Sequence, residues 1–118
     1  MTTYKELIYW KKSVELVVLV YKFTADFPKE EIYGLISQMR RAVVSIPSNV
    51  AEGWTRKNTG EYINFLSISN GSAAELETQL IVTQELNYGK KELRDKCFSL
   101  LLEIQKMLTS SINSLRSP

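Results

Sequence analysis

The stretch that decides the fold is RRAVVSIPSNVAEGWTRK, residues 40–57. Its apolar residues recur three and four positions apart, as on one face of an α-helix, yet a proline stands at position 47. A proline inside a helix removes a backbone hydrogen bond and costs about 3 kcal/mol or more. Two structures are compatible with this pattern. Either a helix ends near Ile46 and a new one starts with Asn49 and Glu52 as a capping pair, or one helix continues through a kink.

The phase of the apolar row favours the continuous helix. The row stays in step on both sides of the proline, through Ile32, Leu35, Met39, Val43, Ile46, Val50 and Trp54. A true break would usually shift this phase. We therefore predict one helix over residues 29–56 that is kinked at Pro47, with packing or hydrogen bonds to the freed carbonyl offsetting its cost.

Three further segments have helical spacing, over residues 5–26, 60–88 and 91–115. We predict Thr59 as the N-cap of the third helix and Gly89 as its C-terminal cap. No stretch shows sustained strand alternation, and the short connections make neighbouring helices antiparallel. The sequence thus predicts an all-α protein, an up-down-up-down four-helix bundle that forms a single domain over residues 1–118.

The first helix has more apolar surface than one core stripe requires. Its first arc consists of Leu7, Trp10, Val14, Val17 and Tyr21, and its second arc of Tyr9, Leu16, Val20, Phe23 and Phe27. Because large exposed apolar patches are rare on soluble monomers, we expect another subunit to cover the excess.

Small residues gather in the middle of the third helix, as the row Ser67, Gly71 and Ala74 and separately as Ser69, Ser72 and Ala73. A glycine inside a helix costs about 1 kcal/mol relative to alanine. We interpret these residues as a site of close packing by another backbone. A phosphate-binding loop is the weaker interpretation, because no glycine-rich repeat surrounds Gly71.

Composition excludes several classes of function. The chain has 118 residues and a net charge of +2, which does not by itself indicate nucleic acid. It has one cysteine, Cys97, and no histidine, so an internal disulfide and histidine-based catalysis or metal binding are excluded. The N-terminus is charged and the longest apolar run is Leu16–Val20. We therefore expect neither a signal peptide nor a membrane span, and a cytoplasmic protein.

An enzymatic function has little support from the sequence. No histidine is present to activate Cys97 or a serine as a nucleophile. Cys97 also falls on the apolar row of the fourth helix, which is typical of a core residue. We predict a non-enzymatic protein with no catalytic residue, no metal ligand and no cofactor.

Basic side chains form three clusters, which are the candidate nucleic-acid contacts: Arg40 and Arg41; Arg56 and Lys57; and Lys90, Lys91 and Arg94. The second and third clusters should lie at opposite ends of an antiparallel bundle, so one continuous basic surface would require oligomerisation. Binding would then go through phosphates of RNA or DNA and not through base edges. The alternative is that Arg41 and Arg56 pair with Glu52 along their own helix.

A polar ridge runs along the second helix through Arg41, Ser45, Asn49, Glu52 and Arg56. Such a ridge is usually a solvated face. The alternative is a polar seam of Ser45, Asn49 and Glu52 between helices, either within the bundle or between subunits.

Two long stretches, YGLISQMRRAVVSIPSNVAEGWTR and EYINFLSISNGSAAELETQL, are followed by LNYG. Together they closely resemble the four-helix-bundle proteins encoded within intervening sequences of bacterial 23S ribosomal RNA genes, which often carry the label S23 ribosomal protein. The resemblance covers nearly the whole chain. It implies a homopentamer without enzymatic activity, and the label is not evidence of a ribosome component.

The chain is also similar to the accessory variability protein of diversity-generating retroelements, a more basic pentameric bundle that binds nucleic acid and a reverse transcriptase. Two functions follow as expectations. The first is an oligomeric bundle that binds RNA or DNA through phosphates. The second is a scaffold module that binds a protein partner such as a reverse transcriptase.

Overall fold

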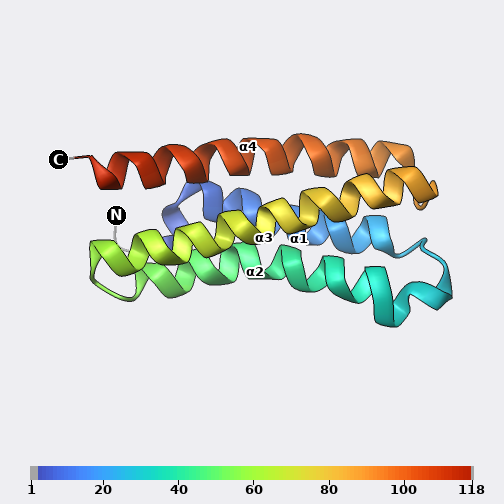
Figure 1. Ribbon diagram of the computed structural model, residues 1–118, viewed down its shortest axis with the longest axis horizontal. Coiled ribbons are helices and arrows are strands. Elements are labelled where there is room, and N and C mark those ends of the chain that lie inside the picture. Colours follow the sequence, from blue (N-terminus) through green and yellow to red (C-terminus); the bar gives the residue numbers. More distant parts are fainter. Residues whose placement is uncertain (1–2, 118) are drawn as a thin grey trace.

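Four long helices carry the fold of the computed structural model, which describes residues 3–117. A 3-10 turn, η1 (Tyr4–Glu6), precedes the four helices α1 (Ile8–Thr24), α2 (Ser37–Trp54), α3 (Thr59–Leu86) and α4 (Lys91–Arg116). Successive helices run in opposite directions (Figure 1), and α1 and α3 each pack mainly against α2 and α4. The predicted all-α four-helix bundle is confirmed. In cross-section, α1 and α3 lie at diagonally opposite corners of the bundle.

The second helix is continuous across Pro47, since α2 runs unbroken from Ser37 to Trp54. The predicted span of 29–56 is too long at its beginning, where a 3-10 turn, η2 (Lys29–Glu31), and a π-helical turn, η3 (Ile32–Ile36), precede α2. The non-helical backbone here lies at Gly34, with φ −111° and ψ −111°. A bend at Pro47 stays a prediction.

Both predicted caps of the third helix are wrong by one or two residues. The N-cap is Asn58, whose side-chain oxygen accepts a hydrogen bond of 3.0 Å from the backbone N–H of Glu61. The C-cap is Asn87, which adopts the left-handed conformation with φ 58°. Asparagine tolerates this conformation because its short polar side chain can bond locally.

Gly89 has a different role from the one predicted. Its φ is +73°, and a Cβ atom added there would lie 2.5 Å from Cε1 of Phe23 and 3.0 Å from Cε1 of Phe27. A glycine is needed at this position because the connection between α3 and α4 passes directly over two core aromatic rings.

The core is built from most of the predicted rows of α2, α3 and α4 and from the second arc of α1. Ile32, which the sequence placed on the second row, is 49% exposed, and Leu101, which the predicted fourth row left out, is buried. All members of that second arc are buried, whereas Val14 and Tyr21 of the first arc are 38% and 41% exposed. The interior position of Cys97 is as predicted, with no exposed surface. The sequence shows two apolar arcs on α1, and the packing decides that the second faces the core.

Close packing between α2 and α3 depends on small residues, but Gly71, which the sequence analysis proposed for this role, is not one of them. Ser69 and Ala73 are fully buried, and a Cβ atom added to Gly53 would lie 2.6 Å from Cβ of Phe65. Gly71, in contrast, is exposed, and a Cβ atom there would meet nothing within 4 Å. Within one chain, the close-packing interpretation is therefore wrong for Gly71.

Candidate functional site

Hydrogen bonds join α2 and α3 beside Pro47. The Ser69 hydroxyl donates to the carbonyl of Ile46 at 2.8 Å, and the hydroxyls of Ser45 and Ser72 share a bond of 2.9 Å. The Asn49 amide donates to the carbonyl of Ser45 at 2.8 Å. The carbonyls of residues 45 and 46, directly before the proline, thus receive side-chain donors. Among the proposed seam residues, Ser45 lies at the α2–α3 contact and Asn49 is bonded to it.

Glu52 lies outside this contact and pairs along its own helix. Its Oε1 is 2.7 Å from Nη2 of Arg56, and both side chains are about half exposed. The Arg56 guanidinium also lies 5.0 Å from the centre of the Phe65 ring. Because both charges are accessible to solvent, a pair at this spacing stabilises the helix by only a few tenths of a kcal/mol.

Arg40 and Arg41 are neighbours in the sequence but have different surroundings. Arg40 donates from Nε to Oγ1 of Thr24 at 3.0 Å, and its guanidinium lies 4.4 Å from the centre of the Tyr21 ring. It therefore holds the C-terminal end of α1 against α2. Arg41 is exposed and lines a polar cleft of about 280 Å³ between α2 and α3, whose floor includes Ser45 and Ser72.

The third basic cluster is divided among separate partners. Lys90 lies 3.8 Å from Asp26, and Lys91 pairs with Asp95 at 2.8 Å. Arg94 is only 6% exposed and donates from Nη1 to the carbonyl of Tyr88 at 3.4 Å.

The three basic clusters do not form one surface in a single chain. Arg56 and Lys57 lie at the α2–α3 end of the bundle, and the third cluster lies at the α3–α4 end (Figure 1). The described residues thus offer separate basic spots, as the sequence predicted from antiparallel helices.

Burial raises the pKa of the Cys97 thiol to about 12, so the reactive thiolate is strongly disfavoured. Among residues 3–117, no cluster of three or more histidine, cysteine, aspartate or glutamate residues is arranged to hold a metal ion. None of the helices in this part of the chain has the length and apolar content to cross a membrane.

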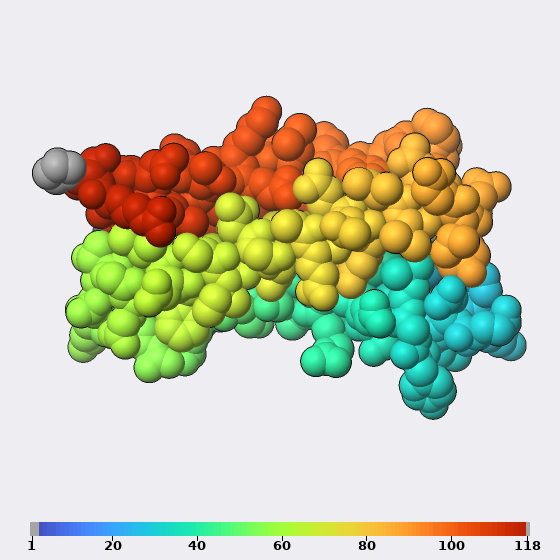
Figure 2. Space-filling model, viewed as in Figure 1, coloured from blue at the N-terminus to red at the C-terminus, as the bar shows by residue number. Residues whose placement is uncertain are grey.

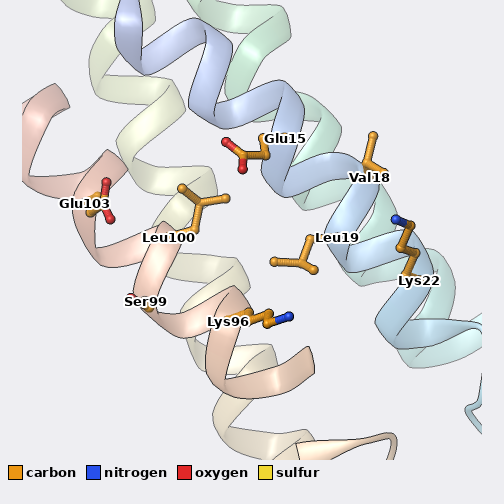
Figure 3. A pocket seen from close by; sticks show the side chains of 8 residues that line it. All are labelled: Glu15, Val18, Leu19, Lys22, Lys96, Ser99, Leu100 and Glu103. Atoms are coloured by element: carbon orange, nitrogen blue, oxygen red, sulfur yellow. The ribbon is translucent and has the colours of Figure 1, made fainter. Parts of the chain in front are cut away.

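A groove of about 560 Å³ lies between α1 and α4 (Figure 3), and the sequence analysis did not predict it. Its apolar lining is Val18, Leu19 and Leu100. Glu15 and Glu103 line it together with two lysines, Lys22 and Lys96. Lys12 pairs with Glu103 at 2.8 Å, which ties α1 to α4 beside the groove and raises the pKa of Lys12.

A signal for this groove exists in the sequence. The α1 residues 15, 18, 19 and 22 and the α4 residues 96, 99, 100 and 103 have the same spacing, with charges at both ends and apolar or small residues between. Recognising it requires knowing that α1 and α4 are neighbours.

The outward face of α1 carries an exposed apolar row, which we call the α1 row: Val14, Val18 and Tyr21. These side chains are 38%, 50% and 41% exposed, and their spacing of four and three places them on one side of the helix. Val18 also lines the α1–α4 groove. Val14 and Tyr21 belong to the first arc that the sequence predicted, whereas Val18 stands in neither arc and Leu7 of the first arc is buried.

Comparison with known proteins identifies a family and similar solved structures. The family model described as 23S rRNA-intervening sequence protein matches residues 5–110. The chain is similar to a crystal structure of a protein with unknown function from the S23 ribosomal protein family of Bacteroides thetaiotaomicron VPI-5482. The two share 27% identity and a TM-score of 0.79, over 89% of this chain and 98% of that one. None of the curated proteins matches the chain.

Proposed function

The chain belongs to the family of 23S rRNA-intervening sequence proteins, and from this premise we propose that it is a non-enzymatic helical-bundle module that works as an assembly of identical copies. The observation that carries the proposal is the α1 row, with an exposed fraction of 50% at its central residue, Val18. Residues of this kind are usually covered by a partner when they form a continuous row. The resemblance implies five copies.

The assembly is tested by sedimentation equilibrium at micromolar concentration. We expect a species several times heavier than the 13.5 kDa chain, and a mass of five chains would match the resemblance. A species of single-chain mass over the whole concentration range would contradict the proposal.

A second candidate function is binding of RNA or DNA through its backbone phosphates. Arg41 and Lys57 are the best-placed residues for these contacts. Both are exposed, and neither takes part in the ion pairs of residues 3–117. An assembly would repeat these positive charges around its axis. Contacts of this kind are largely independent of sequence and weaken steeply with salt, because bound counterions are released.

Fluorescence anisotropy with RNA and DNA oligomers of mixed sequence, at low salt, tests this second function. We expect Arg41→Ala and Lys57→Ala each to weaken binding to all oligomers alike, whereas Lys106→Ala, an exposed lysine outside the clusters, is the matched control. Without binding at tens of micromolar protein, the remaining function is a scaffold for a protein partner, such as a reverse transcriptase. A pull-down with identification of bound RNA and protein would then identify that partner.

A further inference from the structure

The outward face of α3 is apolar toward its C-terminal end, and the helix as a whole is acidic. Ile81 and Val82 are 49% and 40% exposed, and Ala74, Thr78 and Gly71 continue this face toward the start of the helix without large side chains. From Thr59 to Leu86 the chain has four glutamates and neither lysine nor arginine. This face, which we call the α3 face, is turned toward the viewer in Figure 2.

Within residues 3–117, nothing packs over the α3 face at Gly71. Thr78 bonds back to the carbonyl of Ala74 at 3.0 Å, so its hydroxyl is satisfied within the helix. Gly71 costs the helix about 1 kcal/mol relative to alanine, and no atom of the chain lies where its Cβ would stand. The flat surface at Gly71 and Ala74 is suited to the close approach of another helix.

The α1 row has the opposite electrostatic character. Lys11 and Lys22 are exposed on the same side of α1 as the row, and the Arg40 guanidinium lies over the Tyr21 ring. Arg40 bonds to the neutral Thr24 hydroxyl and not to a carboxylate. Glu15 is the one acidic residue at this border, because the α1 segment Ile8–Thr24 contains no other.

We propose that the α1 row of one copy docks on the α3 face of a second copy, as a contact between two different surfaces. The inference rests on the self-association proposed above and identifies the surfaces that make it. Apolar side chains would be covered on both partners, and the lysines of α1 would lie against the glutamates of α3. Complementary charge of this kind selects the partner and its orientation.

The position of the two helices in the bundle determines the type of assembly. Because α1 and α3 lie at diagonally opposite corners of the bundle, with α2 and α4 between them, their outward faces are available to two different neighbours. A contact between unlike faces is heterologous, and it produces a closed ring or an open filament. A ring of five is compatible with such a contact, whereas a contact that pairs like with like closes at two copies.

The test uses one variant for each surface. Val18→Glu adds a negative charge to the α1 row, and Ile81→Lys adds a positive charge to the α3 face. Each variant alone should sediment at single-chain mass. Mixed in equal amounts they should associate into complexes of at least two chains, because the intact α3 face of the first variant meets the intact α1 row of the second. Leu102→Glu and Leu102→Lys are the matched controls, since Leu102 on α4 is 50% exposed and lies outside both surfaces.

The outcomes separate this inference from the proposed function. Wild-type protein of single-chain mass would overturn both. Assembled wild-type protein whose mass is unchanged by Val18→Glu and Ile81→Lys would overturn the contact and leave self-association intact. Two single-chain variants that remain separate when mixed, at a concentration where the wild type is assembled, would also overturn it. Far-ultraviolet circular dichroism of each variant verifies that the bundle is folded.

Discussion

The hydroxyl of Ser69 on α3 donates a hydrogen bond of 2.8 Å to the backbone carbonyl of Ile46 on α2, and both residues are fully buried. Ile46 directly precedes Pro47, where α2 lacks one backbone donor. This bond joins α3 to α2 one residue before the proline, whereas the carbonyl that Pro47 leaves without its helical donor is that of Val43, four residues earlier.

Replacement of Pro47 tests how well α2 accommodates an interior proline. Pro47→Ala should keep the fold and change the free energy of unfolding by at most about 1–2 kcal/mol in either direction, because the site already accommodates the proline. Urea unfolding followed by circular dichroism measures the change. Loss of helical signal in the folded baseline would show that the proline itself is required for the local structure.

Removal of the Ser69 hydroxyl should cost more than removal of an exposed one on the same helix. Ser69→Ala takes a donor away from a buried carbonyl and should lower the free energy of unfolding by about 1–2 kcal/mol. Ser67→Ala is the control, since Ser67 is exposed, and should stay within about 0.5 kcal/mol of the wild type. Equal effects of the two substitutions would mean that the Ile46 contact contributes nothing.

Two helix-interior glycines should respond to alanine with opposite signs. Gly53→Ala places a methyl group 2.6 Å from Cβ of Phe65, and overpacking of this kind costs about 1–3 kcal/mol. Gly71→Ala meets open space and should stabilise the chain by about 0.5–1 kcal/mol through helix propensity.

Both glycine variants are best measured in the Val18→Glu background, so that assembly does not contribute to the unfolding free energy. Thermal and urea unfolding give the sign directly. Stabilisation by Gly53→Ala would contradict the close α2–α3 approach.

Cys97 should make stability fall at alkaline pH. Burial raises the pKa of its thiol to about 12 from an ordinary value of 9.0. The unfolded chain therefore releases the proton first. The buried, protonated thiol makes its full contribution to the free energy of unfolding below pH 9. This contribution is lost as the pH rises from 9 toward 12, by about 1.4 kcal/mol per pH unit.

The comparison with Cys97→Ala isolates this contribution, because the variant lacks the titrating group and should have a shallower decline above pH 9. Below that pH, the folded wild-type protein should react with thiol reagents only after denaturant is added. Rapid labelling of the native protein would show that Cys97 is accessible.

For the candidate contact residues, the sequence could not assign the surroundings of each side chain. Arg40 and Arg41 are about 100° apart around an α-helix. One therefore holds the end of α1 and the other is exposed in a polar cleft. The seam expected from Ser45, Asn49 and Glu52 divides in the same way, because Glu52 bonds to Arg56 while Ser45 meets Ser72 on α3.

Helical periodicity and composition are local properties of the chain, so the amino-acid sequence was enough to predict the four helices, most of their apolar rows and the interior position of Cys97. The tertiary structure alone decided which arc of α1 faces the core, which glycine permits close packing, and where the α1–α4 groove lies. These features depend on which residues distant in the sequence become neighbours. Such neighbours are set by the packing of whole helices, which no local pattern specifies.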